Sequence, residues 1–422
     1  MDKRVIFLIV MMWMLAVVGS YAADMRQGIF HHGFKTLKVT REGNEFAPPV
    51  IMLGDVNDRI RIEFDELSEE RRFMRYELVH CDALWRPEGL VASEFLDGFN
   101  EGLVEDYDFS QATLAHYVHY TITIPNQDIR ITQPGNYLVR VYDESDPDET
   151  LLQARFGVTD FTAKIDAGVT TRTDIDTNRE HQQVSVTVDT RHVNSLDDPF
   201  GDLTVVVTQN GREDNKVVLT APQRVAGDKV IYEHLRPLIF EAGNEYRRFE
   251  TVSTTYPGMG VAEITYADPL YNMTLYTDTP RSMSSYLYDS TQHGRFFVRE
   301  GNSVDSDLQA DYVVVHFALE MPQLPGKDLF LDGDFVSRRF DPNSRMVYNH
   351  ATGCYENSML LKQGAYNYKY LAVPAGSTRG SEREIEGNFY ETVNEYTVMV
   401  YHRPRGSRFD RLIGVAMISS GE

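Results

Sequence analysis

The chain lacks most of the residues that hold small exported domains together. Among its 422 residues it has only two cysteines, Cys81 and Cys354. Disulfide-stabilised domains are rich in cysteine, so these domains must instead be held together by apolar burial. The positions of the two cysteines leave open whether they are paired.

Familiar catalytic motifs are also missing. The sequence contains no G-x-S-x-G elbow, no H-E-x-x-H pair and no G-x-x-x-x-G-K-[ST] loop. A glycosidase could still combine two carboxylates from separate loops, and sequence spacing leaves that alternative open. With no positive indication of chemistry, we expect no catalytic residue, no cofactor and a protein that is not an enzyme.

Positive charge is scarce. The chain has 41 Lys and Arg residues against 63 Asp and Glu residues, which gives a formal net charge of −22. Such a surface repels phosphate backbones and anionic lipid headgroups, so nucleic acid is excluded as a partner.

Long apolar runs are absent beyond the first residues. Lys3 and Arg4 precede the apolar run 5–18, and Ser20-Tyr21-Ala22 provides small residues for cleavage. This is the layout of a cleaved signal peptide over residues 1–22. Its removal takes away a net +1 and changes the formal charge from −22 to −23. The alternative is an uncleaved anchor, for which the run is short. We expect an exported, soluble protein without direct membrane insertion.

What the chain does have is strand after strand. Segments rich in Val, Ile, Thr and Tyr alternate between apolar and polar residues and are separated by Gly, Pro, Asn and Asp, which is typical of half-buried strands. The predicted strands are 59–64, 118–125, 136–143, 183–190, 202–211, 274–279, 311–319, 366–373 and 395–403. The pattern predicts an all-β protein of tandem immunoglobulin-like β-sandwich domains.

Two polar connectors divide this series of strands. One follows the hairpin at 143–150, and the other follows Tyr288. They predict an N-terminal sandwich over 23–160, a middle sandwich over 161–290 and a C-terminal sandwich over 291–422, each of typical sandwich size.

A histidine and a cysteine stand side by side in the stretch 76–90, "YELVHCDALWRPEGL". On a strand, successive side chains project to opposite faces. His80 and Cys81 therefore should not converge on one metal ion or act as base and nucleophile. Buried cysteine behaves as a small apolar residue, so we interpret both as structural. Trp85 is interpreted as a core residue at the end of the strand.

Other metal-ligand candidates also have simpler interpretations. In "HYVHY", His116 and His119 have a spacing that suits zinc on a helix, but this segment is strand-like. The loop "DIDTN" at 174–178 lacks the Gly and Glu that a calcium loop needs. Asp305 and Asp307 in "DSD" are interpreted as ordinary loop carboxylates. We therefore predict no metal site.

Several stretches resemble a known family. They include "LGDVNDRIRIEFDEL", the run from "RRFMRYELVHCDALWRPEGL" to "NYLVRVYD", and "LLKQGAYNYKY". The chain is similar in these stretches to the plug protein of the type IX secretion system of Bacteroidota, densely in the first domain and again near residues 360–370. Phe95 and Asn100 depart from the expected pattern. The residues that carry the resemblance, called the signature residues below, are His80, Cys81, Asp82, Trp85, Gly98, Phe99, Tyr107, Ser110, Tyr117, His119, Tyr120, Lys362, Gln363, Gly364, Tyr366 and Tyr368.

The resemblance implies a periplasmic protein at the inner side of the outer membrane. It would bind the periplasmic mouth of the large outer-membrane β-barrel translocon and plug it when idle. We interpret the signature residues as structural, expect a monomer, and expect the chain to stay in the periplasm because no further sorting domain is recognisable after "RLIGVAMISSGE".

A carbohydrate-binding β-sandwich protein of the cell envelope is the alternative. "LFLDGDFVSRRF" at 329–340 superficially resembles the strand–turn–strand of glycogen-binding sandwiches. Such modules stack sugars on exposed aromatic side chains. No tryptophan follows Trp85, so Tyr366, Tyr368 and Tyr370 would have to form an exposed strip.

Overall fold

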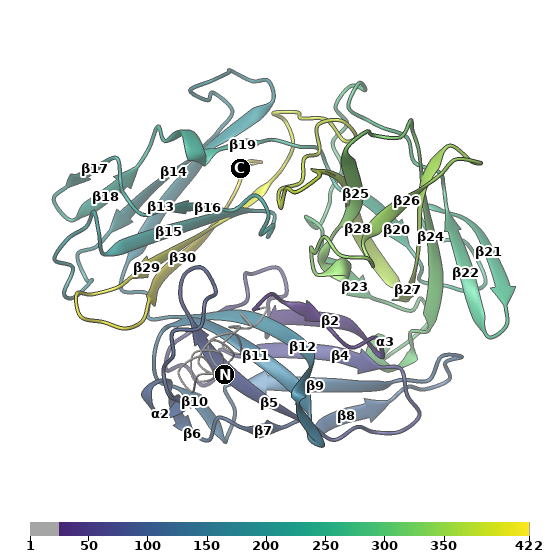
Figure 1. Ribbon diagram of the computed structural model, residues 1–422, viewed down its shortest axis with the longest axis horizontal. Coiled ribbons are helices and arrows are strands. Elements are labelled where there is room, and N and C mark those ends of the chain that lie inside the picture. Colours follow the sequence, from purple (N-terminus) through teal and green to yellow (C-terminus); the bar gives the residue numbers. More distant parts are fainter. Residues whose placement is uncertain (1–24, 422) are drawn as a thin grey trace, which may run out of the picture.

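The computed structural model describes residues 25–421. The predicted signal peptide, residues 1–22, lies outside the described residues. Three β-rich units surround a common centre (Figure 1). Within the described range, no helix has the length and hydropathy needed to cross a membrane. The prediction of an all-β protein built of tandem sandwiches is confirmed.

The first unit, residues 25–160, is a sandwich of two main sheets. One has the order β1-β12-β11-β5-β7 with β3 beside β12, the other has the order β2-β4-β9-β8, and β10 pairs with β6 in a small third sheet. Their elements are β1 (Gly28–Ile29), β2 (Phe34–Arg41), β3 (Val50–Met52), β4 (Ile60–Glu66), β5 (Met74–Cys81), α2 (Ala92–Phe95), β6 (Leu96–Gly98), β7 (Gly102–Leu103), β8 (Asp106–Phe109), β9 (Val118–Ile124), β10 (Ile129–Ile131), β11 (Gly135–Asp143) and β12 (Asp146–Thr159).

The middle unit begins after residue 160 and is completed by the last two strands of the chain. Its sheets have the orders β13-β14-β18-β17, with β19 beside β14, and β16-β15-β29-β30. Its elements are β13 (Lys164–Thr170), β14 (His181–Asp189), β15 (Leu203–Gln209), β16 (Val217–Leu219), β17 (Arg224–Ala226), β18 (Lys229–Tyr232), η1 (Arg236–Leu238), β19 (Ile239–Glu241), β29 (Glu395–His402) and β30 (Arg411–Ser419).

Along the chain, the third unit comes between these two parts of the middle unit. Its strands form one hydrogen-bonded path, β20-β28-β25-β26-β27-β24-β22-β21, with β23 beside β28. Its elements are β20 (Arg247–Glu250), β21 (Val261–Ala267), β22 (Leu270–Leu275), β23 (Phe296–Val298), α3 (Ser306–Gln309), β24 (Tyr312–Glu320), β25 (Lys327–Asp332), η2 (Asp334–Val336), β26 (Arg345–Asn349), β27 (Cys354–Lys362) and β28 (Gly364–Pro374).

The strand pairing does not follow the predicted ranges 161–290 and 291–422. β29 pairs with β15 over seven residue pairs, from Leu203↔His402 to Gln209↔Tyr396. Val398 and Val400 are fully buried in the core of the middle unit. Figure 1 shows β29 and β30, in yellow, among the teal strands of this unit. We therefore propose a different division, in which the third unit is inserted into the middle one between β19 and β29.

Each unit has its own apolar core, formed by the inward-facing residues of its strands. In β4, Ile60, Ile62 and Phe64 are fully buried, as alternation along a half-buried strand requires. The nine segments predicted as strands all overlap observed strands; 274–279 overlaps least, because β22 ends at Leu275. Period-two alternation therefore located the strands correctly.

Candidate functional site

The outer face of the sheet β2-β4-β9-β8 carries a row of charged side chains. Asp65 on β4 and His119 on β9 are direct partners in the antiparallel register, so their side chains are neighbours on one face. Glu63 lies two residues before Asp65 and shares that face, opposite the apolar Phe64. Alternation would expose this polar face to solvent, yet Asp65 is 0% exposed and Glu63 5% exposed.

The third unit covers this face and pairs with its charges. Lys362, the last residue of β27, extends Nζ to Oδ2 of Asp65 and to the backbone oxygen of Asp307, each at 2.6 Å. The same ammonium group lies 4.0 Å from the ring centroid of Tyr117. The hydroxyl of Tyr312 also donates to Oδ2 of Asp65, at 2.6 Å. The buried lysine and aspartate are therefore paired with each other across the boundary between the units.

The charges of this cluster support one another. Burial by itself would raise the pKa of Asp65, but the nearby Lys362 and the hydrogen bond from His119 outweigh it and lower the pKa. Burial would lower the pKa of His119, but its hydrogen bond to Asp65 and the nearby carboxylate of Glu63 outweigh burial and raise the pKa to about 9. Nδ1–H of His119 donates to Oδ1 of Asp65 at 2.7 Å, whereas the buried Nε2 lacks a hydrogen-bond partner among the described residues.

Backbone contacts extend this first–third junction. Asp311, which precedes β24, accepts from the backbone N–H groups of Leu114 and Ala115 at 2.8 and 3.0 Å. Its own N–H donates to the side chain of Gln363 at 2.9 Å. The hydroxyl of Ser110 accepts the N–H of Tyr117 at 3.1 Å and so shapes the loop that docks here. These hydrogen bonds hold the loop before β9 of the first unit against the start of β24 in the third unit.

The first unit meets the middle unit at a second junction, formed by loops. His80 is buried, and its Nδ1 lies 2.8 Å from Oε2 of Glu88. The other oxygen of Glu88 accepts the backbone N–H of Asp410 at 2.8 Å and also binds Arg403. A carboxylate oxygen of Asp410 in turn accepts the N–H of Ala83 at 2.8 Å. The loop after β5 and the loop before β30 are therefore bonded to each other in both directions.

The neighbouring signature residues shape the same loop. Asp82 accepts the N–H groups of Leu84 and Arg86 at 2.8 Å each, which closes the turn. Cys81 is fully buried on the other face of β5 from His80; burial raises the pKa of its thiol to about 12. Both cysteines are free thiols, which answers the question of pairing. His80 and Cys81 do not form a joint site.

The prediction that Trp85 is a core residue is wrong. Trp85 is only partly buried and belongs to none of the described core clusters. Its backbone has φ of +64°, a left-handed conformation in the tight turn after β5, so Trp85 does not continue the strand. The guanidinium group of Arg155 stacks on the indole at 4.4 Å from the ring centroid.

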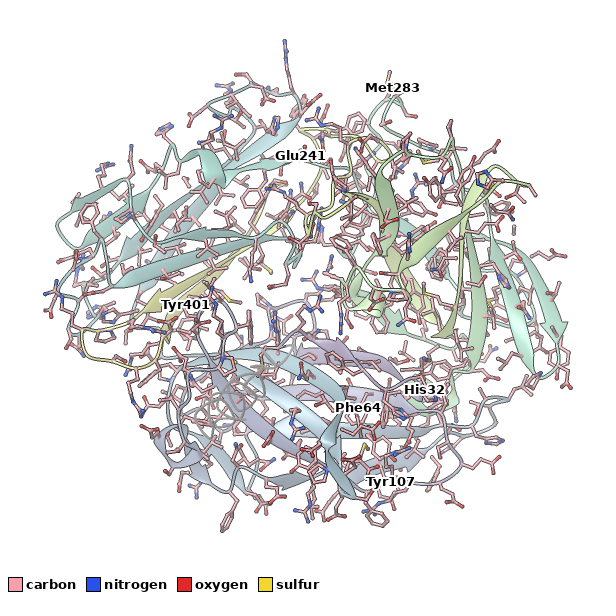
Figure 2. All side chains as sticks on the ribbon, in the orientation of Figure 1. His32, Phe64, Tyr107, Glu241, Met283 and Tyr401 are labelled. Carbon is pink, nitrogen blue, oxygen red and sulfur yellow. The ribbon has the colours of Figure 1, made fainter. Side chains whose placement is uncertain are left out.

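That indole lines a cavity of about 280 Å³ at the centre of the molecule. All three units contribute to its walls: Trp85 from the first unit, Tyr401 from the middle unit and Arg338 from the third. Figure 2 shows Tyr401 on the side of the middle unit that faces the first. The hydroxyl of Tyr401 donates to Oδ1 of Asn136 at 2.9 Å, which adds to the first–middle junction.

The remaining signature residues have packing roles, with Phe99 as the exception. Tyr120, Tyr366 and Tyr368 are buried in the cores, and Tyr107 packs against Tyr120 with ring centroids 6.2 Å apart. Gly364 cannot carry a side chain, because a Cβ there would lie 2.3 Å from the backbone oxygen of Phe297. Phe99 is different.

Phe99 is 83% exposed and contributes to no described core cluster. Its backbone is nevertheless held on both sides. A Cβ on Gly98, whose φ is +122°, would lie 2.0 Å from the backbone oxygen of Asp128. The amide of Asn100 donates to the backbone oxygen of Leu78 and accepts its N–H, at 2.8 Å each. Packing therefore does not explain this aromatic ring, which a rigid loop presents to solvent.

Four residues of the junction were not predicted from the sequence: Glu63, Asp65, Tyr312 and Asp311. The available signal was the run "RIEFDE", in which two acidic residues alternate with buried apolar ones. That pattern is equally typical of a solvated strand face. The histidine pair considered above is separated in the structure, because His116 is exposed before β9 whereas His119 is buried within it.

The fold and its junctions define a class of protein: tandem β-sandwiches whose three units are locked together by buried polar contacts. The family model for the first domain of the type 9 secretion system plug protein matches residues 34–160. A hypothetical protein from Parabacteroides merdae, known from its crystal structure, is 40% identical, with 93% of this chain and 99% of that chain covered and a TM-score of 0.92. The chain belongs to the family of type 9 secretion system plug proteins.

This family is a non-catalytic, periplasmic component of that secretion system. No curated protein matches the chain. An alkylpurine DNA glycosylase from Pseudomonas fluorescens shares 19% identity over 30% of this chain and 29% of its own, and with a TM-score of 0.18 the likeness carries no argument.

Proposed function

We propose that this protein binds the periplasmic mouth of the large outer-membrane barrel of the type 9 secretion system and closes it while no cargo is handled. The family match supports a role in that system, and the locked arrangement of the three units supports the closing role. A body that seals a wide pore must not open between its parts. Here the first unit is bonded to both of the others through residues that also carry the family resemblance.

A third junction completes the arrangement. Arg212 of the middle unit is 3% exposed and pairs with Glu382 at 2.8 Å, in the segment that leads from β28 to β29. Lys369 on β28 binds the same carboxylate at 2.9 Å. Buried ion pairs therefore join the third unit to both of the others, and buried hydrogen bonds of Glu88 and Asp410 join the first unit to the middle one. A hinge motion of the third unit would have to break a desolvated ion pair, which costs several kcal/mol.

The contact surface that we favour is the edge of the first unit that faces away from the other two. β6, β7 and β8 lie along this edge (Figure 1). It carries exposed apolar side chains: Phe99 at 83%, Phe73 at 61%, Leu103 at 48% and Phe109 at 48%. Exposed aromatic residues on rigid loops are typical anchors of protein interfaces. Phe99 is the signature residue that the fold itself does not require, and we assign it to the barrel.

A pull-down from outer-membrane extracts of the native host tests this proposal. The wild-type chain is expected to retain a very large β-barrel protein in roughly equal amount. Phe99→Ser should reduce that recovery at least tenfold. Met283→Ser should not, since Met283 is 97% exposed but lies on the third unit, far from this edge (Figure 2). Recovery of no membrane protein by the wild type would contradict the proposed function. Equal recovery of the barrel protein by both variants would contradict only the proposed contact surface, and not the proposed function.

Closure of the pore can be tested separately from binding to the barrel. A strain that lacks the protein is expected to become more sensitive to large antibiotics that the outer membrane normally excludes. Unchanged sensitivity, together with intact binding to the barrel, would mean that the protein attaches to the translocon without closing it.

The carbohydrate-binding alternative required an exposed strip of tyrosines, which the structure does not provide. Tyr366, Tyr368 and Tyr370 are 1%, 4% and 0% exposed and pack in the core of the third unit, so they form no platform for a sugar. Affinity electrophoresis in a glucan gel is expected to show no retardation.

A further inference from the structure

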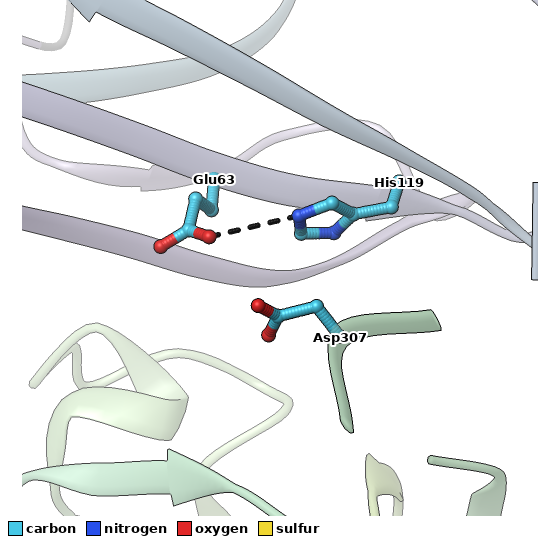
Figure 3. Close-up of side chains that lie close together, drawn as sticks. All are labelled: Glu63, His119 and Asp307. Atoms are coloured by element: carbon cyan, nitrogen blue, oxygen red, sulfur yellow. Dashed lines mark ion pairs between the residues drawn. The ribbon is translucent and has the colours of Figure 1, made fainter. Parts of the chain in front are cut away.

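Glu63, His119 and Asp307 converge at the first–third junction (Figure 3). One potential ligand atom from each lies within 4.8 Å of the others. Glu63 and His119 come from adjacent strands of the first unit, and Asp307 comes from α3 of the third. Glu63 is 5% exposed and His119 9% exposed, so the group is largely removed from water.

The histidine is oriented for a ligand that the described residues do not supply. Its Nδ1–H is bonded to Asp65, which sets the ring orientation and directs Nε2 toward Glu63 and Asp307. Nε2 is buried and lacks a hydrogen-bond partner among the described residues; Oε1 of Glu63 is 3.6 Å away, beyond hydrogen-bond length. A carboxylate behind a ligating histidine is the usual support of a metal site.

The separation of the ligand atoms also fits an ion. Bonds of about 2.0–2.2 Å in a tetrahedral arrangement hold neighbouring ligand atoms about 3.3–3.6 Å apart. Nε2 of His119 and Oε1 of Glu63 are already at such a distance, 3.6 Å. The side chain of Asp307 is partly exposed and its carboxylate makes no hydrogen bond or ion pair among the described residues, so a small rotation brings it to the same point.

We propose that Glu63, His119 and Asp307 bind one divalent transition-metal cation of the zinc type, with a water molecule in the fourth position. One imidazole and two carboxylates are ligands that zinc accepts. Three positive side chains lie near the site, so a bound cation has to share the carboxylate of Glu63 with them. Arg61 pairs with Oε1 of Glu63 at 2.9 Å, Lys38 lies 3.8 Å from Oε2, and Lys362 is held by Asp65. Asp108, the register partner of His119 on β8, adds a further carboxylate on the same side of the sheet.

Because the ligands come from two units, the ion would join the first unit to the third beside the Asp65–Lys362 pair. The site would therefore stabilise the assembly of the units and has no need of a catalytic role. This inference does not rest on the proposed function, since it concerns residues inside the molecule and not the surface that meets the barrel.

Zinc binding to the untagged protein tests the site. The chain is freed of metal with EDTA, dialysed, and titrated with Zn²⁺ in competition with a chromophoric chelator. We expect one tight site per chain and a rise in the unfolding temperature on adding Zn²⁺. Asp307→Asn should weaken binding at least tenfold and abolish the rise, without disturbing the fold, because the backbone of Asp307 and not its carboxylate bonds Tyr117 and Lys362.

Two controls make the test specific. Asp305→Asn changes an exposed acid on the same loop and should bind Zn²⁺ like the wild type. Replacement of His31 and His32 by Gln removes a stacked histidine pair near the start of the described chain and should also leave the tight site intact. Absence of stoichiometric zinc binding, or wild-type binding by Asp307→Asn, would overturn the proposal.

Discussion

The first unit is attached to its two neighbours in physically different ways. Toward the third unit it presents a sheet face, and the central pair is desolvated: Asp65 is 0% and Lys362 1% exposed. Toward the middle unit it presents loops, and the outer ion pairs are open to water, with the side chains of Arg403 and Arg408 44% and 62% exposed. Both junctions contain signature residues.

The difference teaches where rigidity comes from. A buried charge cannot leave its partner without a large desolvation cost, whereas an exposed ion pair exchanges freely with water. The first–third junction should therefore resist opening through its charges. The first–middle junction depends on buried backbone bonds around Glu88 and Asp410, and its rim charges add little.

Breaking the buried pair should have the largest effect. Lys362→Met leaves the carboxylate of Asp65 buried without its cation, and the free energy of unfolding is expected to fall by about 3–5 kcal/mol. Chemical denaturation followed by fluorescence measures this. Lys327→Met is the matched control: Lys327 pairs with Glu384 at a partly exposed site and should cost about 1 kcal/mol or less. Equal effects of the two substitutions would refute the contrast.

The second-largest loss of stability is expected from acidification, which acts at the junction between the middle and third units. Burial lowers the pKa of His293 to about 4, despite Glu395 at 3.6 Å; Arg295, Lys369 and Arg338 lower it further. Because the folded pKa lies below the unfolded value of 6.5, the unfolded chain binds more protons between these values. Stability should therefore decrease as the pH falls from 6.5 to 4, by up to about 3 kcal/mol.

Thermal unfolding across this range measures the slope. His293→Gln should remove the part of the slope that this residue contributes, while the effect of the other buried groups remains. An identical pH profile for the variant would show that His293 does not carry the effect.

The loop junction should respond to loss of its central acceptor. Glu88→Ala leaves buried His80 and the N–H of Asp410 without their acceptor. The expected loss of stability is about 1–3 kcal/mol. Hydrogen exchange should show faster exchange at the N–H of Asp410, with little change at Leu114 in the other junction. Equal acceleration at both positions would mean that the two junctions open together.

The exposed rim should matter least. Arg408→Ala removes an ion pair with Glu94 that is open to water, so no measurable change in unfolding temperature is expected. A clear decrease would show that the rim of the loop junction is as important as its buried bonds.

Much of the fold could be predicted because its signal is local. Alternation in segments such as 183–190 located strands correctly, and the opposite projection of His80 and Cys81 followed from the pleat alone. The division after Tyr288 did not match the pairing, because hydrogen bonding between β15 and β29 joins residues nearly two hundred positions apart. No pattern within either strand indicates which distant strand it will meet.

The candidate site shows the same limit more sharply. Glu63 and Asp65 alternate with buried residues, and the sequence by itself determined that they share the polar face of a strand. Only the tertiary structure decided that this face is covered, with Lys362 and Asp307 brought to it from the third unit. The physical reason is that side-chain periodicity states which residues point the same way, whereas the burial and charge of a face depend on what packs against it.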